Sequence, residues 1–252
     1  MKPALLPLFA AALLAACATP PAPDTPPPAA AGDWQPLGLP GKKATVYRWT
    51  EKDGRVALEA SADHSASLWR KRLQPSMLNV GEVSFSWWAQ NLIPGANVSE
   101  IDHEDAIARV IFGFGGDVDK LPLKTRMKFE LAQALTGEQP PYATLMYVWD
   151  SQLPVGTVVI NPRSDRIRKI VVDSGPAGLH RWRDHKRDLA ADFRLAFGEE
   201  PGPLVTMAVM TDSDNNGASA RTWYGAVEVS KPAAVNGGAA GAVTPRAAAP
   251  GP

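Results

Sequence analysis

The sequence predicts a mainly-β domain, an antiparallel β-sandwich with one or two α-helices packed against it. Eight or nine short segments alternate apolar and polar residues, as the strands of a half-buried antiparallel sheet do. Glycine, asparagine and aspartate stand between these segments, where tight turns need them. Only two segments have helical periodicity, and they do not alternate regularly with the strands, so a doubly wound parallel sheet is not expected.

The sandwich is expected over residues 34–231, because this stretch holds every aromatic residue except Phe9. Its length of about 200 residues suits one domain. On its N-terminal side, residues 17–33 are rich in proline and alanine, which favours an extended polyproline tether. On its C-terminal side, residues 232–252 are mostly alanine, glycine and proline, and we expect a disordered tail there.

The start of the chain has the features of a lipoprotein signal. A lysine precedes an apolar run that ends at Ala16, and this run is shorter than the roughly 20 residues that a membrane-spanning helix needs. The motif Leu14-Ala15-Ala16-Cys17 resembles the bacterial lipoprotein signal, in which residues 1–16 are removed and Cys17 is acylated. By the same resemblance, Ala18 after the cysteine favours the outer membrane. We therefore expect an envelope protein whose lipid anchor binds the outer membrane, facing the periplasm or the cell surface. The alternative is an ordinary signal peptide with an incidental cysteine.

The expected strands begin with a hairpin. Residues 45–49 and 56–60 alternate on either side of Lys52-Asp53-Gly54, and the glycine can adopt the positive φ that a tight hairpin turn requires. In the next strand, residues 83–87, the side chains of Trp87 and the following Trp88 must point to opposite faces. The remaining strands are expected at residues 106–114, 144–149, 157–161, 168–173, 204–211 and 222–229.

Helices are expected in two places. Residues 182–197 carry an apolar stripe at helical spacing, and Gly198 is well placed to end that helix. Residues 124–136 are the second candidate, which would end before Gly137. The apolar stripe of the first helix consists of Trp182, Leu189, Phe193 and Phe197.

Composition excludes several classes of function. The chain has 26 basic and 26 acidic residues, so it lacks the basic excess typical of nucleic-acid-binding proteins, and no nucleic-acid partner is expected. A single cysteine excludes intrachain disulfides and multi-cysteine metal sites. The chain has no G-x-S-x-G turn, which disfavours an esterase of the α/β-hydrolase type.

Four stretches of the chain carry a resemblance to a known bacterial family. They are Trp87-Trp88 with Glu104-Asp105 and Arg109; Leu145 to Trp149; Trp182 to Arg187 with Asp192 and Phe197 to Pro201; and Met210 to Gly217 with Trp223-Tyr224-Gly225. They resemble the family known as domain of unknown function 3047. This resemblance implies a secreted or lipidated envelope protein with a jelly-roll fold akin to carbohydrate-binding modules, and it implies no activity and no catalytic residue. Asn216 departs from the family pattern, which usually has threonine at that position.

Three aromatic residues, Trp88, Tyr147 and Trp149, are the expected ligand-binding surface. Sugar rings stack their C–H faces on such side chains, while polar neighbours bind the hydroxyl groups. The competing interpretation of any single ring is a place in the core, because tryptophan is largely buried in most domains.

Arg109 is the fourth candidate for ligand binding, because it lies in an apolar strand and must either be paired or face a cleft. A cleft arginine would bind a carboxylate or a uronic acid. We favour the structural alternative, an internal salt bridge to Asp192 or Asp173.

The segment Asp212–Gly217 resembles the first half of a calcium-binding loop. Its first, third and fifth positions carry the oxygen-bearing side chains of Asp212, Asp214 and Asn216. Position twelve is Trp223 rather than the glutamate of an EF-hand, so further ligands would have to come from elsewhere in the fold. The alternative is a turn without metal, in which Asp and Asn side chains close Asx turns and Gly217 takes positive φ.

The expected function is non-catalytic binding of a glycan or another envelope ligand, and two alternatives stay open. A polysaccharide-acting enzyme would use Glu104 or Asp105 as acid or base, facing a second carboxylate across a cleft. A structural or partner-binding lipoprotein would act through its tether and tail. A groove lined by the rings of Trp88, Tyr147 or Trp149 would favour binding.

Overall fold

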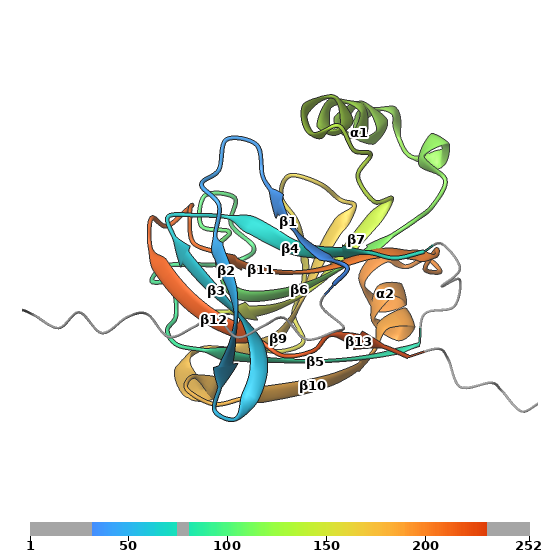
Figure 1. Ribbon diagram of the computed structural model, residues 1–252. Coiled ribbons are helices and arrows are strands. Elements are labelled where there is room, and N and C mark those ends of the chain that lie inside the picture. Colours follow the sequence, from blue (N-terminus) through green and yellow to red (C-terminus); the bar gives the residue numbers. More distant parts are fainter. Residues whose placement is uncertain (1–31, 75–80, 231–252) are drawn as a thin grey trace, which may run out of the picture.

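The computed structural model describes residues 32–74 and 81–230, which form two packed β-sheets and two α-helices (Figure 1). The predictions for the signal, for Cys17, for the tail and for nearly all of the tether fall outside these residues. The strands are β1 (Trp34–Gly38), β2 (Val46–Lys52), β3 (Arg55–Asp63), β4 (Ser67–Arg72), β5 (Glu82–Ala89), β6 (Ala106–Phe114), β7 (Ala143–Asp150), β8 (Val158–Ile160), β9 (Ile167–Ser174), β10 (Arg183–Asp188), β11 (Leu204–Asp212), β12 (Ser219–Tyr224) and β13 (Glu228–Val229). The helices are α1 (Leu123–Thr136) and α2 (Leu189–Phe197), with short 3₁₀ turns at Val118–Lys120 and Pro176–Gly178.

The strands form a seven-stranded sheet in the order β1-β4-β11-β6-β7-β9-β8 and a six-stranded sheet in the order β10-β5-β12-β3-β2, with β13 added beside β5. The strand pairs within these sheets are antiparallel with one exception. β7 and β9 run parallel, because the chain leaves β7 and forms the edge strand β8 before it returns as β9 between the two. The predicted mainly-β, jelly-roll-like sandwich with packed helices is confirmed.

The predicted hairpin is present as β2 and β3. Lys52 pairs with Arg55 across a two-residue turn of Asp53 and Gly54. Both turn residues have positive φ, 48° for Asp53 and 76° for Gly54, which matches the twist of a tight hairpin.

The core lies between the two sheets, and the period of two along each strand decides which residues enter it. In β6, Val110, Phe112 and Phe114 belong to the large buried cluster between the sheets. The alternate residues Arg109 and Ile111 point to the outer face of the seven-stranded sheet, where they line a groove. β6 is therefore buried on both faces: one face packs in the core between the sheets, and the other faces the groove on the outer side.

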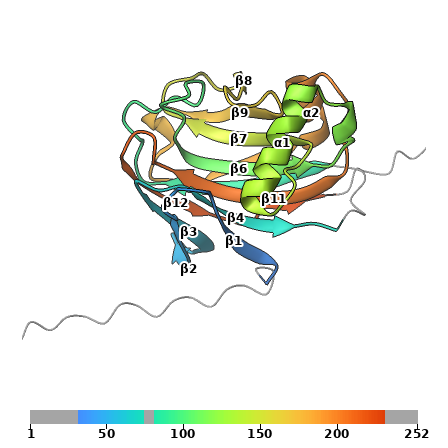
Figure 2. The same cartoon turned by 90° about the horizontal axis from the view of Figure 1, so that it is seen from above.

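The helix predicted over residues 124–136 is confirmed as α1, and Gly137 ends it in the left-handed conformation with φ of 74°. Figures 1 and 2 place α1 over the outer side of the seven-stranded sheet, in front of β11, β6 and β7 in the view from above. No helix in the described part of the chain is both long and apolar enough to cross a bilayer.

The helix predicted over residues 182–197 is correct only from Leu189 onward. Residues 183–188 instead form β10, which pairs antiparallel with β5 from Arg183 opposite Trp87 to Asp188 opposite Glu82. Charged residues that alternate between half-buried and exposed suit an edge strand. Residues 183–188 therefore form a strand, although Trp182 and Leu189 are spaced as on one face of a helix. Asp188 then caps α2, because its carboxylate accepts the N–H of Ala191 at 2.9 Å.

Candidate functional site

Tyr147 and Trp149, two of the predicted ligand-binding residues, are core residues. Tyr147 is 0% and Trp149 1% exposed. The polar atom of each ring also has a partner within the protein: the Tyr147 hydroxyl donates to Asp192 at 2.7 Å, and the Trp149 indole donates to the carbonyl of Gly175 at 3.0 Å. The prediction that these rings are offered to a ligand is therefore wrong, because their strand β7 turns them toward the other sheet.

Trp88 lies on the opposite face of β5 from Trp87, as predicted, but it too is covered. Its exposed fraction is 7%, and it packs against Trp223 with Trp182 beside them. The ammonium group of Lys52 lies 3.8 Å from the centre of the Trp88 ring, a cation–π contact that closes the outer side. The β2–β3 hairpin thus carries the residue that covers the ring, which sequence alone could not place there.

Three other tryptophans surround an open pocket of about 340 Å³. Trp34, Trp49 and Trp69 are half-buried, and they come from β1, β2 and β4. The floor between them is apolar and buried. It is formed by Leu58, Met207, Val209 and Tyr224, while Lys71 and Glu228 supply the charged groups of the lining.

The pocket forms where the two sheets end on the same side of the sandwich. β1 is an edge strand of the seven-stranded sheet and β2 an edge strand of the six-stranded one, and each edge contributes one ring. Tyr47, also in β2, packs on Trp69 with ring centroids 5.5 Å apart and donates its hydroxyl to the carbonyl of Ser67 at 2.6 Å. These three tryptophans are site residues that the sequence interpretation missed.

A second hollow, a groove of about 560 Å³, follows the outer face of the seven-stranded sheet. Its lining is aliphatic along the sheet and charged at one end, and none of the described residues that line it is aromatic. The aliphatic part includes Leu37, Leu39, Leu68, Ile111, Met146, Ala208 and Met210; the charged end includes Lys42, Glu104, Arg109, Arg163, Asp212 and Asp214.

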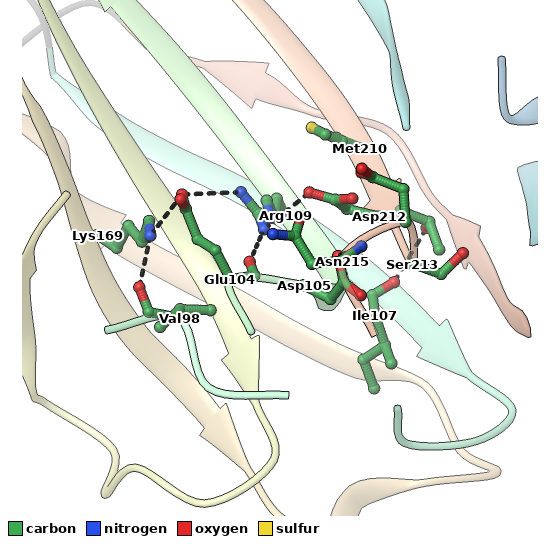
Figure 3. A network of polar contacts seen from close by, with 12 residues as sticks. Val98, Glu104, Asp105, Ile107, Arg109, Lys169, Met210, Asp212, Ser213 and Asn215 are labelled. Carbon is green, nitrogen blue, oxygen red and sulfur yellow. Dashed lines mark hydrogen bonds and ion pairs between the residues drawn. The ribbon is translucent and has the colours of Figure 1, made fainter. Parts of the chain in front are cut away.

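Arg109 is the centre of the charged end, and Figure 3 shows it between two carboxylates. One terminal nitrogen lies 3.0 Å from Oδ2 of Asp212, and the other lies 3.9 Å from Oε1 of Glu104. The predicted internal salt bridge is thus present, but its predicted partners are wrong. Asp173 and Asp192 pair instead with Arg183 and Arg187, because both carboxylates lie near β10 and α2, while Arg109 points to the outer face.

Glu104, a candidate acid or base, is held by several donors at once. Its carboxylate is 2.8 Å from the ammonium of Lys169 and accepts a hydrogen bond of 2.5 Å from Asn161, and it is also paired with Arg163. Lys169 is 0% exposed and donates to the carbonyl of Val98 at 2.5 Å. Burial, reinforced by nearby Arg109 and opposed by Glu104, lowers the pKa of Lys169 to about 8.

Asp105, the other candidate acid or base, fixes the loop after β11. Its two oxygens accept the backbone N–H groups of Asn215 and Asn216 at 3.0 and 2.7 Å. Each candidate is thus held by contacts within the protein, Glu104 by three side chains and Asp105 by two backbone N–H groups.

Asp105 also completes a carboxylate cluster with Asp212 and Asp214, in which one oxygen from each lies within 4.8 Å of the others. Asn216, the third predicted calcium ligand, contacts this cluster through its backbone, and its side-chain amide donates to the carbonyl of Pro94 at 3.1 Å. Burial, together with the nearby Asp214 and Asp105, raises the pKa of Asp212 despite the opposing charge of Arg109. Gly217 has a φ of 60°, as predicted for this turn.

Comparison with known proteins relates the chain to one family and to a set of solved structures. Residues 32–228 match the model of the family described as "Protein of unknown function (DUF3047)". None of the curated proteins compared with the chain matches it.

Among solved structures, the chain is similar to endoglucanase cel12A from Rhodothermus marinus, with 12% identity and a TM-score of 0.46 over 80% of this chain and 94% of that chain. It is also similar to endoglucanase 3 of Trichoderma harzianum from family GH12, with 7% identity and a TM-score of 0.39 over 79% and 91% of the two chains. A loop-swap mutant of Xyn11A from Necallimastix patriciarum has 9% identity and a TM-score of 0.36 over 79% and 95%. Likenesses this remote identify neither an activity nor a substrate for this chain.

Proposed function

We propose that this chain, which belongs to the DUF3047 family, is a saccharide-binding module of the bacterial cell envelope, with the Trp34–Trp49–Trp69 pocket as its binding site. The observation that carries the proposal is the convergence of three half-buried indole rings on one open pocket. A soluble domain gains stability by covering such rings, as this chain does with Trp87 and Trp149. Rings left at the mouth of a pocket are therefore available to a ligand.

The chemistry of the lining suits a sugar ring. Indole faces stack against the C–H faces of a pyranose, and the apolar floor excludes water beneath it. Lys71 and Glu228 offer a donor and an acceptor to hydroxyl groups at the rim. The volume of about 340 Å³ lies at the lower end of the roughly 300–1,000 Å³ typical of small-molecule sites, so the pocket suits one or two sugar rings.

The envelope location rests on the sequence. The signal over residues 1–16 and the cysteine at position 17 support secretion and acylation, which would hold the binding module at the membrane on its proline-rich tether. An anchored domain with a sugar pocket would then meet envelope saccharides at short range.

An array of peptidoglycan fragments, lipopolysaccharide oligosaccharides and neutral oligosaccharides, followed by calorimetric titration of the best binder, tests the proposal. We expect binding that Trp49→Ala weakens roughly tenfold or more, as the loss of a tryptophan anchor commonly does. Trp182→Ala is the matched control, because Trp182 is also half-buried and lies outside the pocket.

Glu228→Gln keeps the test decisive if the Trp49→Ala chain does not fold, because Glu228 is exposed. We expect this variant to weaken binding several-fold while circular dichroism stays unchanged. No saccharide bound by the wild-type chain, or equal losses in the pocket variants and Trp182→Ala, would overturn the proposal.

A further inference from the structure

The three carboxylates of Asp105, Asp212 and Asp214 meet although they come from separate parts of the fold. Asp105 stands just before β6, Asp212 ends β11, and Asp214 lies in the turn that follows. One oxygen of each lies within 4.8 Å of the others. Two oxygens bound to the same Ca²⁺ can lie up to roughly 5 Å apart, because Ca²⁺–oxygen distances are about 2.3–2.6 Å, so the three carboxylates are close enough to share one ion.

A second, independent observation that points to a ligand concerns the buried side chain of Asp212. Its side chain is only 9% exposed, and Oδ2 is paired with Arg109. The other oxygen, Oδ1, is buried and has no hydrogen-bond partner among the described residues. A buried carboxylate oxygen without a partner is costly, so such atoms point to an ion or a water that completes the site.

We propose that Asp105, Asp212 and Asp214 bind one Ca²⁺ ion at the charged end of the groove. Carboxylate oxygens are the ligands that hard divalent cations prefer, and Ca²⁺ accepts six to eight of them in flexible geometry. The segment Asp212–Gly217 resembles only the first half of a calcium-binding loop, so a further ligand must come from elsewhere in the fold. Asp105 is that ligand. Asp212 and Asp214 both line the groove, which gives the ion an entry path and room for water ligands.

Two cations of the protein bear on the affinity. Arg109 neutralises one oxygen of Asp212, and Lys42 is paired with Asp214. Lys42 is 41% exposed at its side chain and can move into solvent, so Ca²⁺ can displace it from Asp214. Arg109 is buried and remains paired with Asp212, so we expect a moderate affinity for Ca²⁺. The site goes beyond the proposed saccharide function, because the tryptophan pocket is lined by other residues and the two can be tested separately.

Calorimetric titration of the EDTA-stripped chain with CaCl₂ tests the site, with thermal unfolding as a second readout. We expect one Ca²⁺ per chain and a higher Tm with Ca²⁺, because a ligand of the folded state stabilises it by mass action. Asp212→Asn and Asp214→Asn should each lose both effects. Asp184→Asn is the matched control, since it removes an exposed aspartate that is paired with Arg55 within the six-stranded sheet, whereas Asp212 ends a strand of the seven-stranded sheet.

Lys42→Met separates an ion site from a purely structural cluster. Removing the ammonium group that competes for Asp214 should tighten Ca²⁺ binding by about fivefold. The proposal is overturned if low-millimolar Ca²⁺ gives neither heat nor a Tm shift, or if binding persists in both Asp212→Asn and Asp214→Asn. Unchanged affinity in Lys42→Met would likewise contradict it. If Asp212→Asn does not fold, Asp214→Asn and Lys42→Met still decide the question.

Discussion

The phenol of Tyr147 in β7 donates a hydrogen bond of 2.7 Å to the carboxylate of Asp192 in α2. The same carboxylate accepts two hydrogen bonds from Arg187 in β10, at 2.7 and 2.8 Å. Burial first, and then the charge of Asp192, raises the pKa of Tyr147, so the phenol stays protonated as the donor. The pair thereby links the seven-stranded sheet to the helix and the edge strand across the core.

Tyr147→Phe should destabilise the folded chain by about 1–3 kcal/mol, because a buried carboxylate loses one of its donors while the ring itself is kept. Urea unfolding followed by tryptophan fluorescence measures the change. Tyr142→Phe is the control, since Tyr142 is only half-buried and packs against the guanidinium of Arg166. Equal effects of the two substitutions would show that the Asp192 bond contributes nothing specific.

Arg109→Met should cost about 3–5 kcal/mol in the free energy of unfolding, because it leaves the buried Asp212 without its positive partner. Arg194→Met removes an ion pair with Glu200 in which both side chains are well exposed, and it should change stability by less than about 1 kcal/mol. Chemical denaturation of both variants at one pH gives the comparison. A small loss in Arg109→Met would mean that Asp212 is not held as an ion.

Lys169 should make stability rise with pH. Its pKa is lowered to about 8 in the folded chain, by burial first and then by Arg109, with Glu104 opposing, against an ordinary value of 10.5. Between these values the unfolded chain binds a proton that the folded chain has released, so this group's contribution to the free energy of unfolding increases with pH. Below about pH 8 both states hold the proton and the contribution is constant.

The measurement is the free energy of unfolding from about pH 7.5 to pH 9.5 in wild type, Lys169→Met and Lys186→Met. We expect the wild type and Lys186→Met to gain stability relative to Lys169→Met over this range. Lys186 serves as the control because its side chain is 70% exposed. Three parallel curves would contradict the lowered pKa of Lys169.

Gly202→Ala should destabilise the fold by about 1–3 kcal/mol, through a steric clash. A Cβ at this position would collide with the backbone carbonyl oxygen of Gly115, which cannot move aside as a side chain can. Gly115 is itself held by a 2.8 Å hydrogen bond from its N–H to the carbonyl of Pro203. Gly38→Ala is the matched control, since among the described residues, its two chain neighbours aside, no heavy atom lies within 4 Å of the added Cβ. Similar melting temperatures for the two variants would refute the clash.

Local pattern in the sequence was enough to predict the parts of the fold that depend on local chemistry. The β2–β3 hairpin follows from Asp53-Gly54, and the end of α1 follows from Gly137, because glycine is favoured where φ is positive. The opposite orientation of Trp87 and Trp88 follows from the pleat of a strand. None of these features requires knowledge of a distant contact.

Long-range pairing decided the parts that the sequence did not predict. β10 is a strand because residues 183–188 meet β5, about 100 residues earlier in the chain, and no local pattern announces that pairing. β1 carries Pro36, which disfavours a strand unless it lies at a sheet edge, as β1 does.

The candidate site was only partly predictable for the same reason. Asp212 and Asp214 share one turn, so their pattern is visible in the sequence, whereas Asp105 joins them from a distant loop. Trp34, Trp49 and Trp69 lie on three strands, and whether each ring is covered depends on which strands form the edges of the sheets. An aromatic residue in a strand pattern gives no such information by itself.

The most direct test of the central claim is an NMR titration of the indole N–H signals with the saccharide that binds best on the array. The eight tryptophans of the chain give separate signals once assigned. We expect Trp34, Trp49 and Trp69 to shift on binding while the core residues Trp87 and Trp149 keep their positions. Shifts confined to tryptophans outside the pocket, or no shifts at saturating saccharide, would contradict the account.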